Sequence, residues 1–172
     1  MGRWWPSRKR PQSRIDFERF TNGAQRVIVE TEFSAKRRRG TWVDSSDLLV
    51  GLLLAPTDEP GGVVLREAGL SADSLLPAAP GYEDASWEDF SGIRIPFAGD
   101  IKEALEASHE VSVLAGHEVI APLHLLLGAL DAPVNAGRKL LLARGANPDR
   151  LAADARALLA LPLFPGPGAP RS

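Results

Sequence analysis

Cysteine is absent from this chain, and aromatic residues make up only 6% of its 172 residues. Without cysteine there is no disulfide framework, no thiolate nucleophile and no cysteine-ligated zinc site. With so few aromatic residues the core must be aliphatic, built from Leu, Val and Ala. The 44% of hydrophobic residues is nevertheless enough to fill a core, so the composition indicates a globular protein and is compatible with a reducing compartment.

The chain also lacks an excess of one charge and a long apolar run. Twenty basic residues stand against 22 acidic ones, a formal charge of -2 that is not typical of nucleic-acid-binding proteins. No apolar run approaches the ~20 residues that span a bilayer. The basic start of the chain is not followed by the apolar segment of a secretory signal. We therefore expect a cytoplasmic protein with no membrane partner.

Prolines gather near both ends of the chain. Residues 1–14 hold five basic residues, two prolines and no acidic residue, a composition that predicts a flexible basic arm. Residues 162–172 hold four prolines and predict a second loose tail. The ordered domain is therefore expected at residues 15–161.

This domain is predicted to consist of two halves. Residues 77–94 collect prolines, glycines and four carboxylates without a sustained apolar period, as a connector does. The connector separates repeat one, residues 15–76, from repeat two, residues 95–161.

A shift of 77 residues superposes the apolar pattern of the two repeats. Spacings of i, i+4, i+7, i+8, i+11 and i+15 predict one buried stripe on the first helix of each repeat. The two stripes are Phe20, Ala24, Val27, Ile28, Thr31 and Ala35, and Phe97, Ile101, Ala104, Leu105, Ser108 and Ser112. The same shift carries Leu48, Leu49, Gly51, Leu53, Ala55 and Pro56 onto Leu125, Leu126, Gly128, Leu130, Ala132 and Pro133. The pattern indicates a duplication.

Each repeat is expected to form four helices. The first is long, the second is a Leu-rich core helix, and two short helices close the unit. Gly69 and Gly145 are expected just past the third helices, with Ser71 and Asn147 as the next N-caps. Evidence for strands is thin, so we predict an all-α fold in which two four-helix halves pack across a pseudo-two-fold axis.

Three segments of this sequence resemble a known family, the Clp repeat domain at the N-terminus of ClpC-type ATPase chaperones. The resemblance covers about residues 16–160 and includes its two-repeat spacing. The segments are Phe17-Glu18-Arg19-Phe20-Thr21 followed by Ala24, Arg26 and Val27; IPFAGDIKEALEAS at 95–108; and AGHEVIAPLHLLLGAL at 115–130.

The resemblance implies a helical double repeat that recruits substrates, adaptors and small cyclic peptides to an ATPase ring. No G-x-x-x-x-G-K-[ST] phosphate loop occurs in the sequence. We therefore expect a stand-alone, non-catalytic module. It acts either as an adaptor or regulator of a Clp protease, with Clp ATPase or protease components and substrate proteins as partners, or as a decoy that sequesters hydrophobic cyclic peptides.

The resemblance also implies a binding site. Phe17, Phe97 and Lys102 match the apolar groove that holds cyclic peptides in the family. We expect the two rings to meet as a floor with Lys102 at its edge. For Phe97 the alternative is a buried core residue, because it is the counterpart of Phe20 in repeat two.

A second family site is not matched. ClpC-type domains read phosphorylated arginine through a glutamate near the start of each core helix, and the matching positions here are Ser46 and Leu123. Neither side chain supplies a carboxylate. We expect weak or no phosphoarginine binding, and we expect Asp44 and Asp47 to cap a helix.

The residues show no catalytic or metal-binding pattern. His109, His117 and His124 are eight and seven residues apart, rather than the three or four that place two ligands on one helical face, so we expect core or capping histidines. No G-x-S-x-G motif occurs. The prediction is a protein that is not an enzyme and uses no cofactor or metal.

The alternative to a peptide-binding module is a nucleic-acid-associated helical protein. It would use the basic arm, with Trp4 and Trp5, and the tetrad Lys36–Arg39. The tetrad is also explained as the end of the first helix, where cations complement the helix dipole and Gly40 stops the helix. The connector aromatics Tyr82, Trp87 and Phe90 are expected to hold the connector on the domain.

Overall fold

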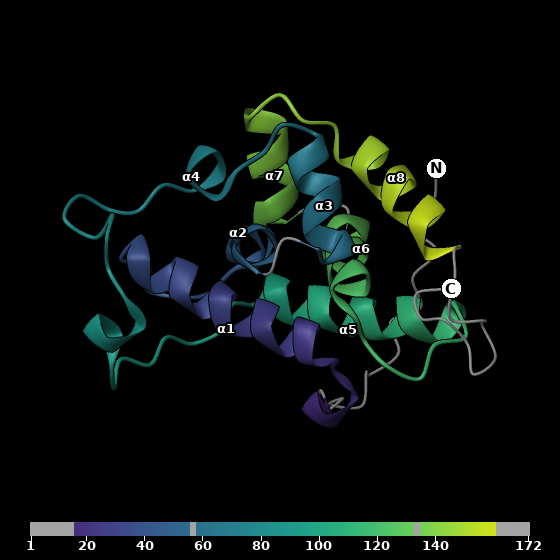
Figure 1. Cartoon of the computed structure of the whole chain (residues 1–172), viewed down its shortest axis with the longest axis horizontal. Coiled ribbons are helices and arrows are strands. Elements are labelled where there is room, and N and C mark those ends of the chain that lie inside the picture. The colour runs from purple at the N-terminus through teal and green to yellow at the C-terminus, as the bar shows by residue number, and fades with distance from the viewer. Residues whose placement is uncertain (1–15, 56–57, 133–134, 161–172) are drawn as a thin grey trace, which may run out of the picture.

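A computed structural model describes residues 16–55, 58–132 and 135–160. Within these ranges the chain forms eight α-helices and two short 3-10 helices, and no strand beyond two isolated bridges (Figure 1). Repeat one holds η1 (Phe17–Arg19), α1 (Asn22–Arg37), α2 (Ser45–Leu54), α3 (Pro60–Glu67) and α4 (Ala72–Leu75). After η2 (Trp87–Phe90), repeat two holds α5 (Gly99–Leu114), α6 (Pro122–Asp131), α7 (Ala136–Ala143) and α8 (Pro148–Leu159). The prediction of an all-α fold with four helices in each half is confirmed.

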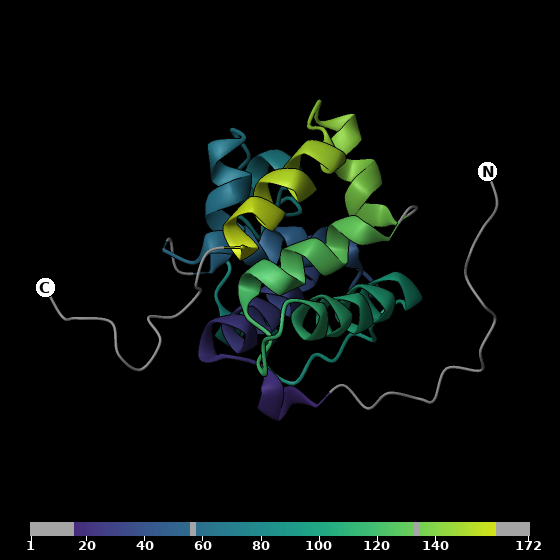
Figure 2. The same ribbon diagram turned by 90° about the vertical axis from the view of Figure 1, so that its right-hand side faces the viewer.

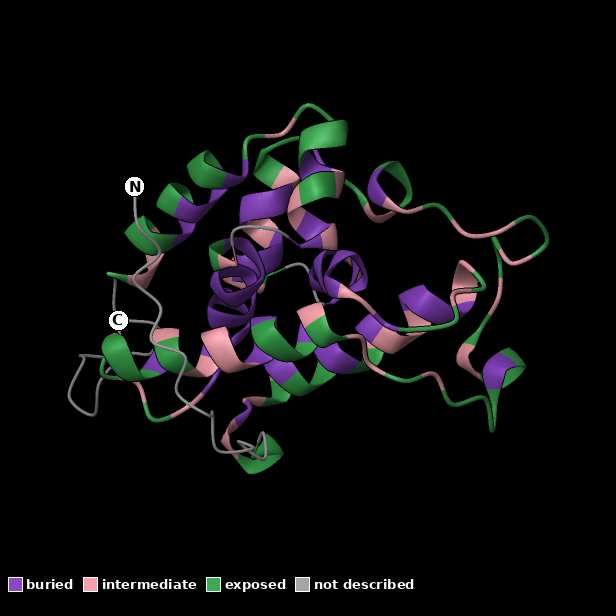
Figure 3. Cartoon of the chain, turned by 180° about the vertical axis from the view of Figure 1, so that it is seen from behind, coloured by how far each residue is buried: buried purple, intermediate pink, exposed green. Residues whose placement is uncertain are grey.

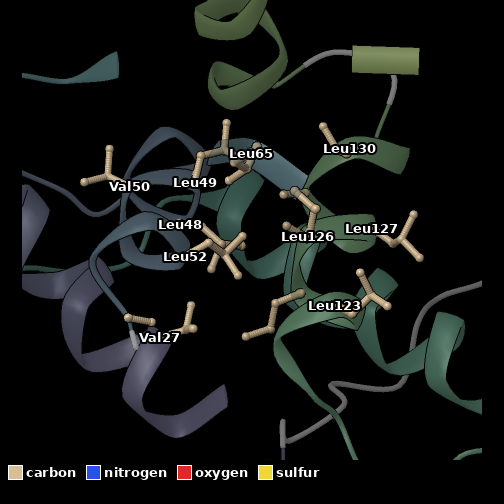
Figure 4. Close-up of a cluster of buried hydrophobic side chains, with 14 of the residues drawn as sticks. Val27, Leu48, Leu49, Val50, Leu52, Leu65, Leu123, Leu126, Leu127 and Leu130 are labelled. Atoms are coloured by element: carbon tan, nitrogen blue, oxygen red, sulfur yellow. The ribbon is translucent and has the colours of Figure 1, made fainter. Parts of the chain in front are cut away.

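The Leu-rich helices α2 and α6 contact each other at the centre of the molecule. Figure 4 shows their side chains meeting, and Figure 3 shows both helices almost entirely buried. Helix α1 packs on α2 and helix α5 packs on α6, so α1 and α5 form one outer layer, seen at the bottom of Figure 2. Each leucine buried here contributes roughly 1.5–3 kcal/mol.

Both predicted stripes face this core. All six residues of the α1 stripe are buried, and so are five of the six in repeat two. The exception is Phe97, which is partly buried and packs against the same core. Helical periodicity therefore located the inner faces of both long helices.

Two backbone bridges show the pseudo-two-fold relation. Phe20 pairs with Ile120, and Val43 pairs with Phe97. Ile120 is the counterpart of Val43 after the 77-residue shift, so the second bridge is the first with the repeats exchanged. The amide of Thr21 donates to Ile120 O at 3.0 Å, and the amide of Val43 donates to Pro96 O at 2.9 Å. The first residues of each repeat are thus attached to the other repeat.

A glycine sits at the crossing of the two main helices in each repeat. A Cβ atom on Gly51 would collide with the Thr31 hydroxyl and with Val27 O, and one on Gly128 would collide with the equivalent atoms on α5. The Thr31 hydroxyl donates to Val27 O at 2.7 Å, and Ser108 makes the same bond at 2.7 Å in repeat two. The repeated glycine therefore reflects a close approach of two helix backbones.

The ends of the shorter helices follow the sequence signals, with one difference in length. Gly69 and Gly145 have φ angles of 80° and 77°, and Ser71 and Asn147 are the following N-caps. Helix α4 has four residues and stops just before Pro77, which disfavours helix at the preceding residue. Helix α8 was expected to be short but has 12 residues, because it has a buried face to pack on α6.

Candidate functional site

A shallow apolar hollow lies where repeat one begins. Asp16 caps η1 by accepting a bond from the Glu18 amide at 3.0 Å, and the ring of Phe17 packs on the ring of Phe20 with centroids 5.2 Å apart. Phe17 nonetheless stays 49% exposed, and Val29 on α1 stays 45% exposed. These two side chains, with Glu18, Gln25 and Ile28, line a hollow of about 380 Å³. Such a surface suits an apolar side chain of a partner.

Arg19 fixes η1 to repeat two. Its Nε and Nη2 atoms each donate to Glu118 O at 3.2 Å, and its Nη1 atom contacts the ring of His109 on α5. Together with the bridge from Phe20 to Ile120, these contacts place the Phe17 hollow at the junction of the two repeats.

Phe97 and Lys102 lie elsewhere on this layer. Phe97 precedes α5 and pairs with Val43, which follows the end of α1. Phe17 precedes α1, and its neighbours Arg19 and Phe20 contact the segment that follows α5. Helices α1 and α5 therefore run in opposite directions (Figure 1). Each has 16 residues, a length of about 24 Å. The structure does not bring Phe17 and Phe97 together as a shared floor; Phe97 and the exposed Lys102 mark the other end of the helix pair.

The two positions that match the phosphoarginine glutamates are buried. Ser46 is 7% exposed and Leu123 is 1% exposed, both in the first turns of the core helices. Asp44 is the N-cap of α2 and accepts from the Ser46 amide at 2.8 Å. Burial, followed by the neighbouring Asp47, raises the pKa of the Asp44 carboxyl. The predicted capping roles of Asp44 and Asp47 are confirmed.

The Asp47 carboxylate is already occupied. It is fully buried and accepts from Arg38 at 2.9 and 2.7 Å and from the Ser34 hydroxyl at 2.9 Å. The bond to Asp47 raises the pKa of Arg38, against the opposing effect of burial. This carboxylate therefore holds α1 and α2 together rather than facing a ligand.

His124 holds the position in α6 that Asp47 holds in α2, a correspondence that the 77-residue shift contains but that sequence reasoning missed. Its Nδ1 accepts from the Ala121 amide at 2.8 Å, so the proton lies on Nε2 and is donated to Nδ1 of His117 at 2.8 Å. Burial, and then the neighbouring His117, lower the pKa of His124 to about 4. The expectation of core or capping histidines is confirmed for His124.

The basic tetrad is engaged by the rest of the domain. The Lys36 ammonium lies 4.5 Å from the centroid of the Trp87 ring, Arg38 binds Asp47, and the Arg39 guanidinium lies 5.8 Å from the Tyr82 centroid. The connector aromatics pack on α1 through stacked and edge contacts, confirming that they hold the connector on the domain. The ring pairs are Phe33 with Trp87, Phe33 with Phe90, and Tyr82 with Phe90.

The described part of the chain has neither a cluster of metal ligands nor a membrane-spanning helix. No group of three or more His, Asp or Glu side chains in residues 16–55, 58–132 and 135–160 is placed to hold a metal ion. None of the helices in those ranges is both long enough and apolar enough to cross a bilayer. The basic arm with Trp4 and Trp5, and the tail at 162–172, lie outside the described residues.

Comparison with known proteins identifies the family of this fold. Residues 97–162 match the family model of the Clp repeat (R) N-terminal domain. The chain is 30% identical over 149 residues to the chloroplastic chaperone protein ClpC of Pisum sativum and 32% identical over 158 residues to the chloroplastic ClpD1 of Oryza sativa. These alignments cover 83% and 86% of this chain but only 15% and 16% of the relatives.

Two solved structures of N-terminal chaperone domains have the same fold as this chain. The N-terminal domain of the chaperone ClpD from Arabidopsis thaliana superposes with a TM-score of 0.63 at 28% identity, covering 84% of this chain and 96% of that domain. The N-terminal domain of Hsp104 from Candida albicans shares the fold, with a TM-score of 0.60 at 15% identity over 81% of this chain and 90% of that one. The chain therefore contains a Clp repeat N-terminal domain with the all-helical fold of the ClpD N-terminal domain.

Proposed function

We propose that this domain is a non-catalytic module that binds peptide or protein ligands, with Phe17, Phe97 and Lys102 among the contacting residues. The observation that carries the proposal is the hollow at the repeat junction, in which Phe17 and Val29 remain about half exposed. Large apolar side chains left exposed together are typical of interaction surfaces. The resemblance to ClpC-type domains supports the same surface.

The geometry indicates how a ligand would lie. Phe17 and Phe97 lie beyond opposite ends of the helix pair, whose 16-residue helices are about 24 Å long, whereas Val29 at the middle of α1 and Lys102 in the first turn of α5 lie between those ends. An extended segment needs roughly seven residues to cover the length of these helices at about 3.3 Å per residue. A small cyclic peptide is shorter than the helix pair and is anchored either by the apolar hollow, which reaches Val29, or by the Phe97 and Lys102 side chains.

The proposed partners of this chain are based on the proteins to which it is similar. Relatives of this chain include an ATP-binding subunit ClpA homolog of the Clp protease from Brassica napus. We propose that this chain serves either as an adaptor or regulator of a Clp protease or as a decoy that sequesters hydrophobic cyclic peptides. Co-purification from the native host separates the two roles, since an adaptor brings down Clp subunits and a decoy does not.

The binding site is tested with the pair Phe17→Ala and Phe20→Ala. A fluorescently labelled hydrophobic cyclic peptide is titrated with each protein, and stability is measured by urea unfolding. Phe17→Ala should weaken binding roughly thirtyfold, about 2 kcal/mol, and change stability little. Phe20→Ala, which removes a buried ring, should cost about 3–5 kcal/mol of folding free energy. Unchanged binding by Phe17→Ala would remove this hollow from the site, and Lys102→Ala then tests the other end.

A further inference from the structure

The end of α1 that carries the Phe17 hollow is acidic. Glu18 lines the hollow, and Asp16 caps η1 beside it. Glu118 follows α5 and accepts from Arg19 through its backbone, and the Glu59 carboxylate lies against Gly23 in the first turn of α1. Asp58 adjoins Glu59, whose pKa is raised by burial and by that neighbour. Acidic residues from three separate segments therefore lie near the start of this helix, with Glu18 in the hollow itself and the Glu59 carboxylate against Gly23.

Two arginines near this end, Arg19 and Arg26, each make a contact within the domain. Arg19 donates to Glu118 O and contacts His109, and Arg26 pairs with Glu30 at 3.4 Å. The apolar hollow thus has Glu18 in its lining and Asp16 beside it, and these two residues together with Asp58, Glu59 and Glu118 near the same end of α1 are called the acidic rim. A partner that combines large apolar side chains with several positive charges fits this surface.

One segment of the chain has that composition and joins the domain at this point. Residues 1–14 contain Trp4, Trp5 and five of the chain's 20 basic residues, and none of its 22 acidic ones. The remainder of the chain therefore carries a net charge of -7, opposite to that of the arm. Trp5 precedes Phe17 by 12 residues, which span up to about 40 Å when extended. The arm is long enough to fold back onto the start of α1.

We propose that residues 1–14 dock on their own domain, with Trp4 and Trp5 in the Phe17 hollow and the basic side chains on the acidic rim. Tryptophan provides a large and rigid apolar surface that loses little conformational entropy on binding. The contact needs no foreign ligand and so goes beyond the proposed function. Because a short tether gives an effective concentration of the order of millimolar, a ligand for the hollow must displace the arm, which acts as a built-in competitor.

The absence of cysteine makes the test direct, because a single introduced cysteine is the only site for a thiol-reactive label. A nitroxide on Ser7→Cys, in the full chain, should broaden the backbone amide NMR signals of Gln25, Ile28 and Val29. The equivalent α5 positions 77 residues later, Lys102, Leu105 and Glu106, serve as internal controls and should be little affected. Adding Trp4→Ala and Trp5→Ala to the labelled chain should abolish the broadening.

A matched pair of surface variants tests the hollow. Val29→Glu should abolish the broadening, whereas Val113→Glu, at a valine on α5 that is 54% exposed and does not line the hollow, should not. The proposal is overturned if the hollow shows no broadening, if the tryptophan variant leaves it unchanged, or if the α5 controls broaden equally. If the broadening occurs only when the nitroxide and the isotope label are on separate molecules, the arm of one copy binds the hollow of another. That result would also overturn the proposal. Arm docking without cyclic-peptide binding would contradict the proposed function alone.

Discussion

At the scale of single residues, the two core helices begin with different chemistry at equivalent positions. The amide of Asp44 donates to the Asp47 carboxylate at 3.0 Å in α2, and the amide of Ala121 donates to Nδ1 of His124 at 2.8 Å in α6. A buried carboxylate needs a counter-ion, which Arg38 supplies. A neutral imidazole needs none, so α6 does without a buried cation.

The neutral state of His124 predicts a loss of stability in acid. Its pKa is about 4 in the folded protein and about 6.5 when exposed, so the unfolded chain binds more protons between these values. Stability should therefore fall as the pH drops from 6.5 towards 4, by up to about 3 kcal/mol from this group. Urea unfolding at several pH values measures the effect.

The variant for this experiment is His124→Gln. Glutamine at position 124 retains an acceptor for the Ala121 amide but does not titrate, so the pH dependence between 6.5 and 4 should become shallower. Equal slopes for the chain and for His124→Gln would show that another group is responsible.

At the scale of helices, the packing depends on the absence of a side chain at each main crossing. Gly51→Ala or Gly128→Ala should separate α1 from α2 or α5 from α6 and destabilise the fold by about 1–3 kcal/mol. Alanine otherwise favours a helix over glycine by about 1 kcal/mol, so a loss of stability identifies the collision. Gly99→Ala on α5, which has no atom within 4 Å of its added Cβ, is the control and should change little. A Gly51→Ala protein as stable as its parent would contradict the close approach.

Much of this element structure could be predicted because it is local or repeated in the sequence. Periodicity located the buried stripes, and the 77-residue shift located the equivalent glycines. The end of α1 was placed less well: Gly40 was the expected stop, but Arg39 adopts the left-handed conformation with φ 59°, where repeat two has Gly116 at 74°. The Arg39 guanidinium lies over the Tyr82 ring, a contact with the connector that no local pattern reveals.

The site was predicted less completely than the fold for the same reason. Phe17 and Phe97 each lie just ahead of a long helix, and a one-dimensional pattern gives no distance between them. Their separation follows from two bridges, Phe20 with Ile120 and Val43 with Phe97, that attach each repeat to the other. Such contacts depend on the relative direction of α1 and α5, which is a tertiary property.

At the scale of the whole molecule, the two repeats share one core. Helix α3 of repeat one packs on α6, and helix α7 of repeat two packs on α2. The Asp100 carboxylate on α5 accepts from the Ser45 hydroxyl on α2 at 2.6 Å and from the Ala136 amide on α7 at 3.2 Å. Each repeat therefore packs on the core helix of the other repeat, and hydrogen bonds also link the two repeats.

This sharing predicts that neither half folds alone. Fragments 1–92 and 93–172, divided after the exposed Gly92, should each show weak helical circular dichroism and no cooperative thermal transition, because separation exposes the leucines of α2 or α6. Mixed in equal amounts they should regain helicity and elute as a one-to-one complex. Adding Leu126→Ala to the second fragment, which leaves a cavity costing about 2–5 kcal/mol, should weaken that complex, whereas the exposed Leu142→Ala should not. A cooperative transition in either isolated fragment would show that a repeat is an independent folding unit and that the interlocking contacts are secondary to its stability.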